Sequence, residues 1–110
     1  MTNKIVVFST CADEEEAGRL ARALVDARLA ACVNIVPRVR SVYRWHDEVE
    51  QAEECLLVIK SSRELFEELT RTLTAAHSYE LPEAVAIPIV EGSGAYLEWI
   101  GHNLKAVGEE

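Results

Sequence analysis

The sequence predicts an α+β fold with an antiparallel sheet, and three observations support this prediction. Short β-branched runs alternate with helical periodicities in the order β-α-β-β-α-β-α. The runs expected as the second and third strands are separated by a few polar residues, which is hairpin spacing. A chain of 110 residues with 49% hydrophobic and 27% charged content is typical of one globular domain, which we expect to span residues 1–110.

The N-terminal part of the chain predicts a strand followed by a helix. Lys4 to Ser9 is an almost continuous apolar and β-branched run, which is typical of a buried strand. Asp13, with Glu16 three residues later, forms an N-cap signature. Apolar residues then recur at helical spacing, so we expect this helix to end near Ala27.

A long hairpin is expected next. Residues Cys32 to Trp45 are rich in β-branched side chains, and Pro37 interrupts the run. The polar residues 46–48 are few enough for a tight connection. The third strand is then predicted from Val49 to Lys60.

The remainder predicts a helix, a strand and a final helix. Ser61 and Glu64 have capping-box spacing before a helical stripe that ends near Ala75. The fourth strand is expected from Ala84 to Val90, and the last helix after Gly92–Gly94. The order βαββαβ is that of a ferredoxin-like sandwich, here with an additional C-terminal helix.

In such a sandwich strands one and three are central, and strands two and four are edges. Pro37 and Pro88 fall in the expected edge strands, where a missing N–H is tolerated. Right-handed crossovers place both main helices on one face of the sheet. The third strand is nevertheless apolar on both sides, with Cys55, Leu57 and Ile59 on one side and Leu56 and Val58 on the other. We therefore expect an oligomer that covers the second face.

Charge and composition exclude several partners. The net charge of −8, with no cluster of Lys and Arg, argues against nucleic acid. Cations match this charge better, and the alternative is an acidic surface that serves solubility. No run approaches the ~20 apolar residues that span a membrane, and the first residues lack secretory features, so we expect a cytoplasmic protein. Cys11, Cys32 and Cys55 lack C-x-x-C spacing, which predicts reduced thiols rather than a disulfide framework or a tetrahedral zinc site.

Ligand-capable side chains are densest between His77 and Glu83. An imidazole and a carboxylate three to six residues apart can face one ion if the loop turns, and imidazole suits copper, zinc or nickel. The alternative is a solvated surface loop. Cys11, expected in an exposed turn after the first strand, is a candidate soft ligand or oxidation site. An acidic stretch is interpreted as a solvated strand surface, and comprises Glu48, Glu50, Glu53 and Glu54.

Catalysis is not indicated. The cysteines and histidines carry no signature of a nucleophile and its base, and neither G-x-G-x-x-G nor the P-loop pattern occurs. We therefore expect a protein that binds without turnover.

Several segments taken together resemble the CutA divalent-ion tolerance family. The segment His77 to Glu83 is similar to the family signature His-Pro-Tyr-Glu-x-Pro-Glu, and further matches are Ala30–Ile35, Ser41–Trp45, Leu57–Ser61 and Pro88–Trp99. The resemblance implies a ferredoxin-like homotrimer with long hairpins between subunits. It also implies tolerance of divalent metals through binding of Cu(II), with Zn(II) as the second choice.

Carried over by position, the resemblance implies His77 and Glu83 as metal ligands, with Cys32 matching a cysteine of many members. It also implies a patch at the subunit boundary, formed by Tyr43, Trp45, Lys60, Tyr79, Glu80 and Trp99. An alternative function is a PII-like trimeric signalling module, in which Lys60 and backbone amides hold small anions between subunits.

This sequence departs from the family pattern at three positions. Ser9 stands where some members carry a cysteine implicated in copper binding, which weakens the case for a soft copper site. Ser78 replaces the usual proline and removes a φ restraint, so we expect a looser loop. Asp47 replaces the glycine of the hairpin turn, and because Asp tolerates left-handed backbone we expect the turn to survive.

Overall fold

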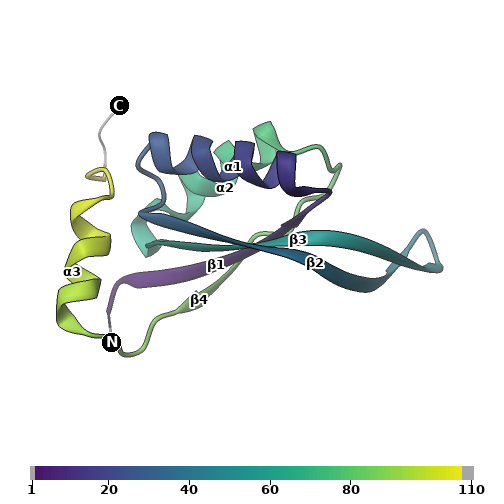
Figure 1. Cartoon of the computed structure of the whole chain (residues 1–110). Helices are drawn as coiled ribbons and strands as arrows, with labels where there is room; N and C mark the ends of the chain where they lie inside the picture. Colours follow the sequence, from purple (N-terminus) through teal and green to yellow (C-terminus); the bar gives the residue numbers. More distant parts are fainter. Residues whose placement is uncertain (1, 108–110) are drawn as a thin grey trace.

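Within residues 2–107, which the computed structural model describes, a four-stranded antiparallel sheet carries two helices on one face (Figure 1). The strand order is β2-β3-β1-β4, which places strands one and three in the centre as predicted. The strands are β1 (Lys4–Cys11), β2 (Cys32–Trp45), β3 (Glu48–Ser62) and β4 (Val85–Pro88). The helical elements are α1 (Glu14–Asp26), the 3-10 turn η1 (Arg63–Leu65), α2 (Phe66–Ala76) and α3 (Gly94–His102). The predicted α+β fold is confirmed.

Helices α1 and α2 cover the same face of the sheet, while α3 stands at the end of the sheet nearest the N-terminus (Figure 1). The core between sheet and helices is built from alternate strand residues and helical stripes, namely Ile5, Val7, Leu57, Ile59, Leu20, Leu24, Leu69 and Leu73. On the opposite face, the apolar residues Val6, Phe8, Leu56 and Val58 are only partly buried within residues 2–107. The uncovered apolar face expected from the sequence is therefore present.

Helix α1 begins as its sequence predicts. The Asp13 side chain accepts a hydrogen bond from the Glu16 N–H at 2.9 Å, which satisfies one of the free amides of the first turn. The helix ends at Asp26, and Arg28 then takes a left-handed φ of 58°. That conformation turns the chain back toward β2.

Three boundaries differ from the predictions. Strand β1 continues to Cys11 rather than ending at Ser9, so Cys11 is buried in the sheet and not in an exposed turn. The predicted Ser61 capping box is wrong, because Ser61 belongs to β3 and its hydroxyl donates to the Leu29 carbonyl at 2.7 Å. Strand β4 is shorter than expected, since it pairs with β1 only over Val85–Pro88.

The β2–β3 hairpin extends beyond the helical layer (Figure 1). Its turn uses left-handed φ values of 50° at His46 and 66° at Asp47, so Asp47 takes the geometry expected of it. A bulge interrupts the β2–β3 register between Val36 and Val39, with Arg38 at φ 60°. Among residues 2–107, no helix is both long enough and apolar enough to cross a membrane.

Candidate functional site

A cleft of about 730 Å³ opens between the hairpin and the loop that follows α2. Five of its lining residues were predicted from the family resemblance, namely Tyr43, Trp45, Tyr79, Glu80 and Glu83. The others are Thr10, Ser41, Val42, Glu50, Glu54, Ser78 and Leu81. Because four glutamates and no Lys or Arg line it, we call it the acidic cleft. Three neighbouring elements and a loop thus contribute to one negatively charged, partly aromatic surface.

Glu54 is the most enclosed carboxylate of the cleft. It is only 7% exposed, so its prediction as a solvated residue is wrong. The Tyr79 hydroxyl donates to Glu54 Oε2 at 2.5 Å, and no Lys, Arg or His of the described chain lies within ion-pair distance of Glu54. Buried charges are ordinarily paired, so this carboxylate favours a cation in the cleft.

Tyr79 remains a hydrogen-bond donor to Glu54. Burial raises the pKa of the Tyr79 phenol, and the hydrogen bond to the negative Glu54 carboxylate raises it further. The phenol is therefore protonated at neutral pH, and it orients Glu54 at the wall of the cleft.

His77 is enclosed rather than open to the cleft. Its side chain is 0% exposed, and its Nε2 lies 2.9 Å from the Thr10 carbonyl. Since a carbonyl only accepts, Nε2–H donates there, while Nδ1 accepts from the Tyr79 N–H at 3.0 Å. Both ring nitrogens are thus engaged, and His77 fastens the loop to β1.

Glu16 of α1 fastens the same loop from the other side. Its carboxylate accepts from the Ser78 N–H at 2.7 Å, the Ser78 hydroxyl at 2.9 Å and the Ala12 N–H at 3.1 Å. Two hydrogen bonds from Ser78 thus hold this loop, and its expected loosening relative to proline stays a prediction. Burial alone would raise the pKa of Glu16, but these hydrogen bonds outweigh burial and lower it below its ordinary value.

Cys32, Lys60 and Trp99 lie outside the cleft. Cys32 of β2 is paired with Lys60 of β3, and Lys60 is paired with Val6 of β1. Val6 lies four residues from Thr10 along β1, so this row of residues is roughly 13 Å from the Thr10 end of the cleft. The Lys60 ammonium donates to the Asn34 side chain. Trp99 stacks on Tyr96 in α3, with ring centroids 5.6 Å apart.

The predicted ligands His77, Glu83 and Cys32 are therefore not brought together within one chain. No group of three or more His, Cys, Asp or Glu side chains in the described residues is arranged to hold a metal ion. A full ligand set centred on His77 stays a prediction, and it would need a rearranged loop or groups from a second copy.

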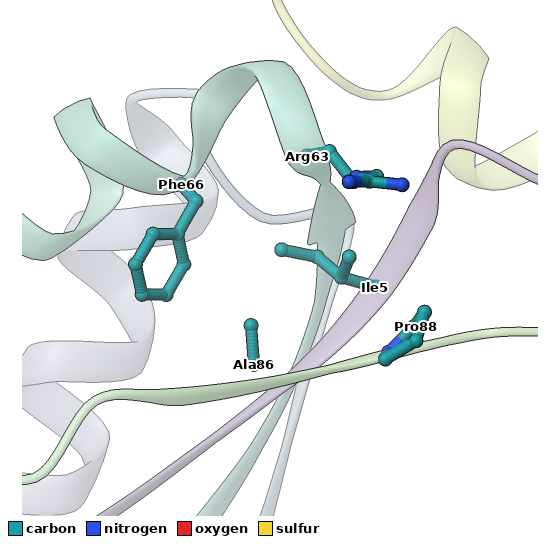
Figure 2. A pocket seen from close by; sticks show the side chains of 5 residues that line it. All are labelled: Ile5, Arg63, Phe66, Ala86 and Pro88. Atoms are coloured by element: carbon teal, nitrogen blue, oxygen red, sulfur yellow. The ribbon is translucent and has the colours of Figure 1, made fainter.

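A second hollow, of about 310 Å³, lies between β1, β4 and the start of α2. Figure 2 shows the Phe66 ring, Ile5 and Ala86 around it, with Pro88 beside it and the Arg63 side chain above Ile5. Its lining is apolar except for this guanidinium, so its chemistry is opposite to that of the acidic cleft.

Residues 5–103 match the model of the CutA1 divalent ion tolerance protein family. The chain belongs to this family. It is 48% identical over 98 residues to the "Divalent-cation tolerance protein CutA" of Thermus thermophilus, covering 89% of this chain and 95% of that relative. It is 45% identical to the chloroplastic CutA of Arabidopsis thaliana and 38% identical to human CutA, covering 92% and 93% of this chain. It spans only 56% and 57% of the length of those two relatives.

Solved CutA structures share the fold. The protein described as Cut A1 from Thermus thermophilus superposes with a TM-score of 0.91 at 46% identity, covering 93% of this chain and 99% of that one. CutA from Xylella fastidiosa gives a TM-score of 0.92 at 38% identity, covering 94% of this chain and all of the other. The resemblance found in the sequence motifs is thus confirmed over nearly the whole chain.

Sequence reasoning missed Glu16, Glu50 and Glu54 as members of the site. Glu16 was assigned only to the N-cap, because its partner Ser78 lies 62 residues away in the chain and meets it only in the fold. A signal for Glu54 was available, because it alternates with Leu56 and Val58 on the apolar second face of β3.

Proposed function

We propose that this CutA family member binds divalent cations at the acidic cleft and performs no catalysis. The observation that carries the proposal is Glu54, a buried carboxylate without a cationic partner in the described chain, inside a cleft with three further glutamates. The family name, divalent ion tolerance, agrees with a cation as the ligand.

Cu(II) is our first choice of ion and Zn(II) the second. The cleft offers carboxylate and phenol oxygens, and for a given set of N and O ligands Cu(II) binds most tightly among first-row divalent ions. The carboxylates are not gathered into a group of three within residues 2–107, so we expect modest affinity with water or a second copy completing the coordination. Glu83 and Glu54 are the proposed ligands, and His77 positions the loop.

Isothermal titration with Cu(II) tests this proposal. Glu54→Gln and Glu83→Gln should each weaken binding roughly tenfold, because each removes one negative charge from the cleft. The exposed Glu15→Gln on α1 is the matched control and should bind as the unchanged protein does. Equal affinity in all four proteins would place the ion elsewhere.

We further propose a cytosolic homotrimer. The uncovered face around Phe8 and Val58 supports self-association, and the number of subunits follows from the family resemblance alone. Relatives differ in their described compartments, since the Arabidopsis protein is chloroplastic and the one from Archaeoglobus fulgidus is described as periplasmic. Native mass spectrometry, metal-free and with Cu(II), measures subunit number and ion number together, and cell fractionation tests the location.

A second candidate function is the binding of small anions, as in PII-like signalling modules. The hollow lined by Arg63 favours it, because its lining combines one guanidinium with apolar side chains such as Phe66 and Ile5, which suits a small acid with an apolar part. A thermal-shift comparison separates the two functions. Only a ligand that prefers the folded state raises Tm, so nucleotides or small acids should do so under this function and Cu(II) under the first.

A further inference from the structure

Two of the three cysteines face each other across the centre of the sheet. Cys11, the last residue of β1, is directly paired with Cys55 of β3. Both side chains point to the helix-covered face, because Cys11 alternates with buried Ser9 and Val7, and Cys55 with buried Leu57 and Ile59. Both are free thiols, 0% and 3% exposed.

This pairing suits a covalent bond between the two sulfurs. Directly opposed residues of antiparallel strands have Cα atoms roughly 4.5–5.5 Å apart, within the roughly 4.4–6.8 Å that disulfides span. Bond formation therefore needs side-chain rotation and a small approach of the Cβ atoms, without a change of register.

We propose that Cys11 and Cys55 are a site of reversible oxidative modification, which a hydroperoxide converts into a cross-strand disulfide. The site lies on the opposite face of the sheet from the acidic cleft, since the neighbours Thr10 and Glu54 line that cleft. Oxidation would join β1 to β3 directly behind the cleft wall, and it is independent of whether the cleft binds a cation.

The chemistry balances with a hydroperoxide as the oxidant. The Cys11 thiolate attacks the peroxide oxygen, which gives a sulfenic acid and releases an alcohol, or water when the oxidant is hydrogen peroxide. The Cys55 sulfur then attacks the sulfenic sulfur and expels water, with its proton leaving in that water. Two thiols lose two hydrogen atoms and the peroxide is reduced.

Access and rate follow from the surroundings of Cys11. Its Sγ lies 3.7 Å from the Asp13 carbonyl, under the exposed loop formed by Ala12 and Asp13, so local opening of this loop admits a small oxidant. Burial raises the pKa of Cys11 to about 11, and the nearby Glu16 of α1 and Cys55 add to the effect. Thiolate is therefore scarce at neutral pH, and the reaction should be slow there and faster as pH rises.

Cys55 is in a similar environment. It is 3% exposed and packs in the same buried core cluster as Cys11. Ser9 precedes Cys11 by two residues on the same buried face, and its hydroxyl has no partner within the described residues. That hydroxyl is a free donor on the face where negative sulfur would form.

Peptide mapping tests the proposal because trypsin separates the three cysteines, on residues 5–19, 29–38 and 45–60. The folded protein is treated with hydrogen peroxide at mildly alkaline pH, quenched, denatured, alkylated and mapped without reduction. We expect the Cys11 and Cys55 peptides to be linked in most chains while Cys32 is alkylated. The linked protein should melt higher by roughly 10 °C, and a dithiol reductant should reverse this shift.

Two outcomes overturn the proposal. One is full alkylation of Cys11 and Cys55 after oxidation of the folded protein, and the other is oxidation of Cys11 to sulfinic acid without a linked peptide. Cys32→Ser is the matched control and should form the same link, since Cys32 is partly exposed and lies in β2 on the other side of the sheet. Cys55→Val should abolish the link, and if this variant fails to fold, the unchanged protein and Cys32→Ser still decide.

Discussion

Glu16 links α1 to the loop that forms one wall of the acidic cleft. Glu16 is 6% exposed, and its carboxylate accepts hydrogen bonds from Ser78 and Ala12. We predict that Glu16→Gln destabilises the protein by about 2 kcal/mol at neutral pH, because charge-assisted hydrogen bonds are lost. Urea unfolding at fixed chain concentration measures this. Glu15→Gln, on the exposed side of the same turn, should change stability by less than about 0.5 kcal/mol.

The same residue predicts a pH dependence. The folded state lowers the pKa of Glu16 below its usual value of 4.5, so its contribution is present above that pH and is lost as pH falls through the folded value. Stability of the unchanged protein should therefore decrease on acidification below about pH 4.5, and Glu16→Gln should decrease less steeply. Parallel slopes for the two proteins would contradict this.

At the scale of the element, the loop from His77 to Glu83 is held by Ser78 where most family members are expected to carry proline. The Ser78 N–H and hydroxyl both donate to Glu16. Ser78→Ala should cost about 1 kcal/mol, because the N–H bond remains, and Ser78→Pro should cost more, about 2–3 kcal/mol, because both bonds are lost. Thermal and urea unfolding check this order. A stabilised Ser78→Pro would show that the φ restraint outweighs the hydrogen bonds.

In the hairpin turn we predict a substitution that stabilises the protein. His46 and Asp47 both occupy the left-handed region, and glycine is the preferred second residue of such a turn. Asp47→Gly should stabilise the protein by about 0.5 kcal/mol. Asp47→Ala, which cannot relieve the positive φ, should be destabilising instead. If both variants shift Tm in the same direction, the turn strain is not the cause.

At the scale of the whole molecule, the apolar face opposite the helices governs assembly. Val58 lies in the centre of this face, paired with Phe8 and Asn34, and is partly buried in one chain. We predict that Val58→Asp gives a smaller species than the unchanged protein by light scattering, because a charge at an apolar interface loses its hydration. Glu15→Lys, on α1, should leave the mass of the assembly unchanged. Circular dichroism of each species verifies that the fold is kept.

The overall fold was predictable because its determinants are local and periodic. Strand and helix order, the central position of β1 and β3, and the edge position of Pro37 and Pro88 all follow from patterns read along the chain. Ser61 misled because a serine before a helix and a serine at the end of a buried strand look alike. Only the burial of Ser61 in the core distinguishes the strand-end serine from a helix-capping one.

The site was predictable only in part. Family resemblance found Tyr43, Tyr79 and Glu83, and the structure places them around one cleft. It did not predict that His77 would be enclosed, because its partners Thr10 and Tyr79 are fixed by packing and not by spacing. Cys11 was expected to be exposed because the strand-like run ends at Ser9. In the structure β1 continues two residues further and buries Cys11.

The bulge in β2 has a consequence for colloidal behaviour. An edge strand of fourteen residues offers a long row of free backbone groups, which could template stacking of further strands into fibres. Pro37 removes one donor from this row, and the left-handed Arg38 bends the strand between Val36 and Val39. The bulge thereby divides the exposed edge into two short segments that run in different directions. A closed oligomer is therefore favoured over open-ended stacking of strands into fibres.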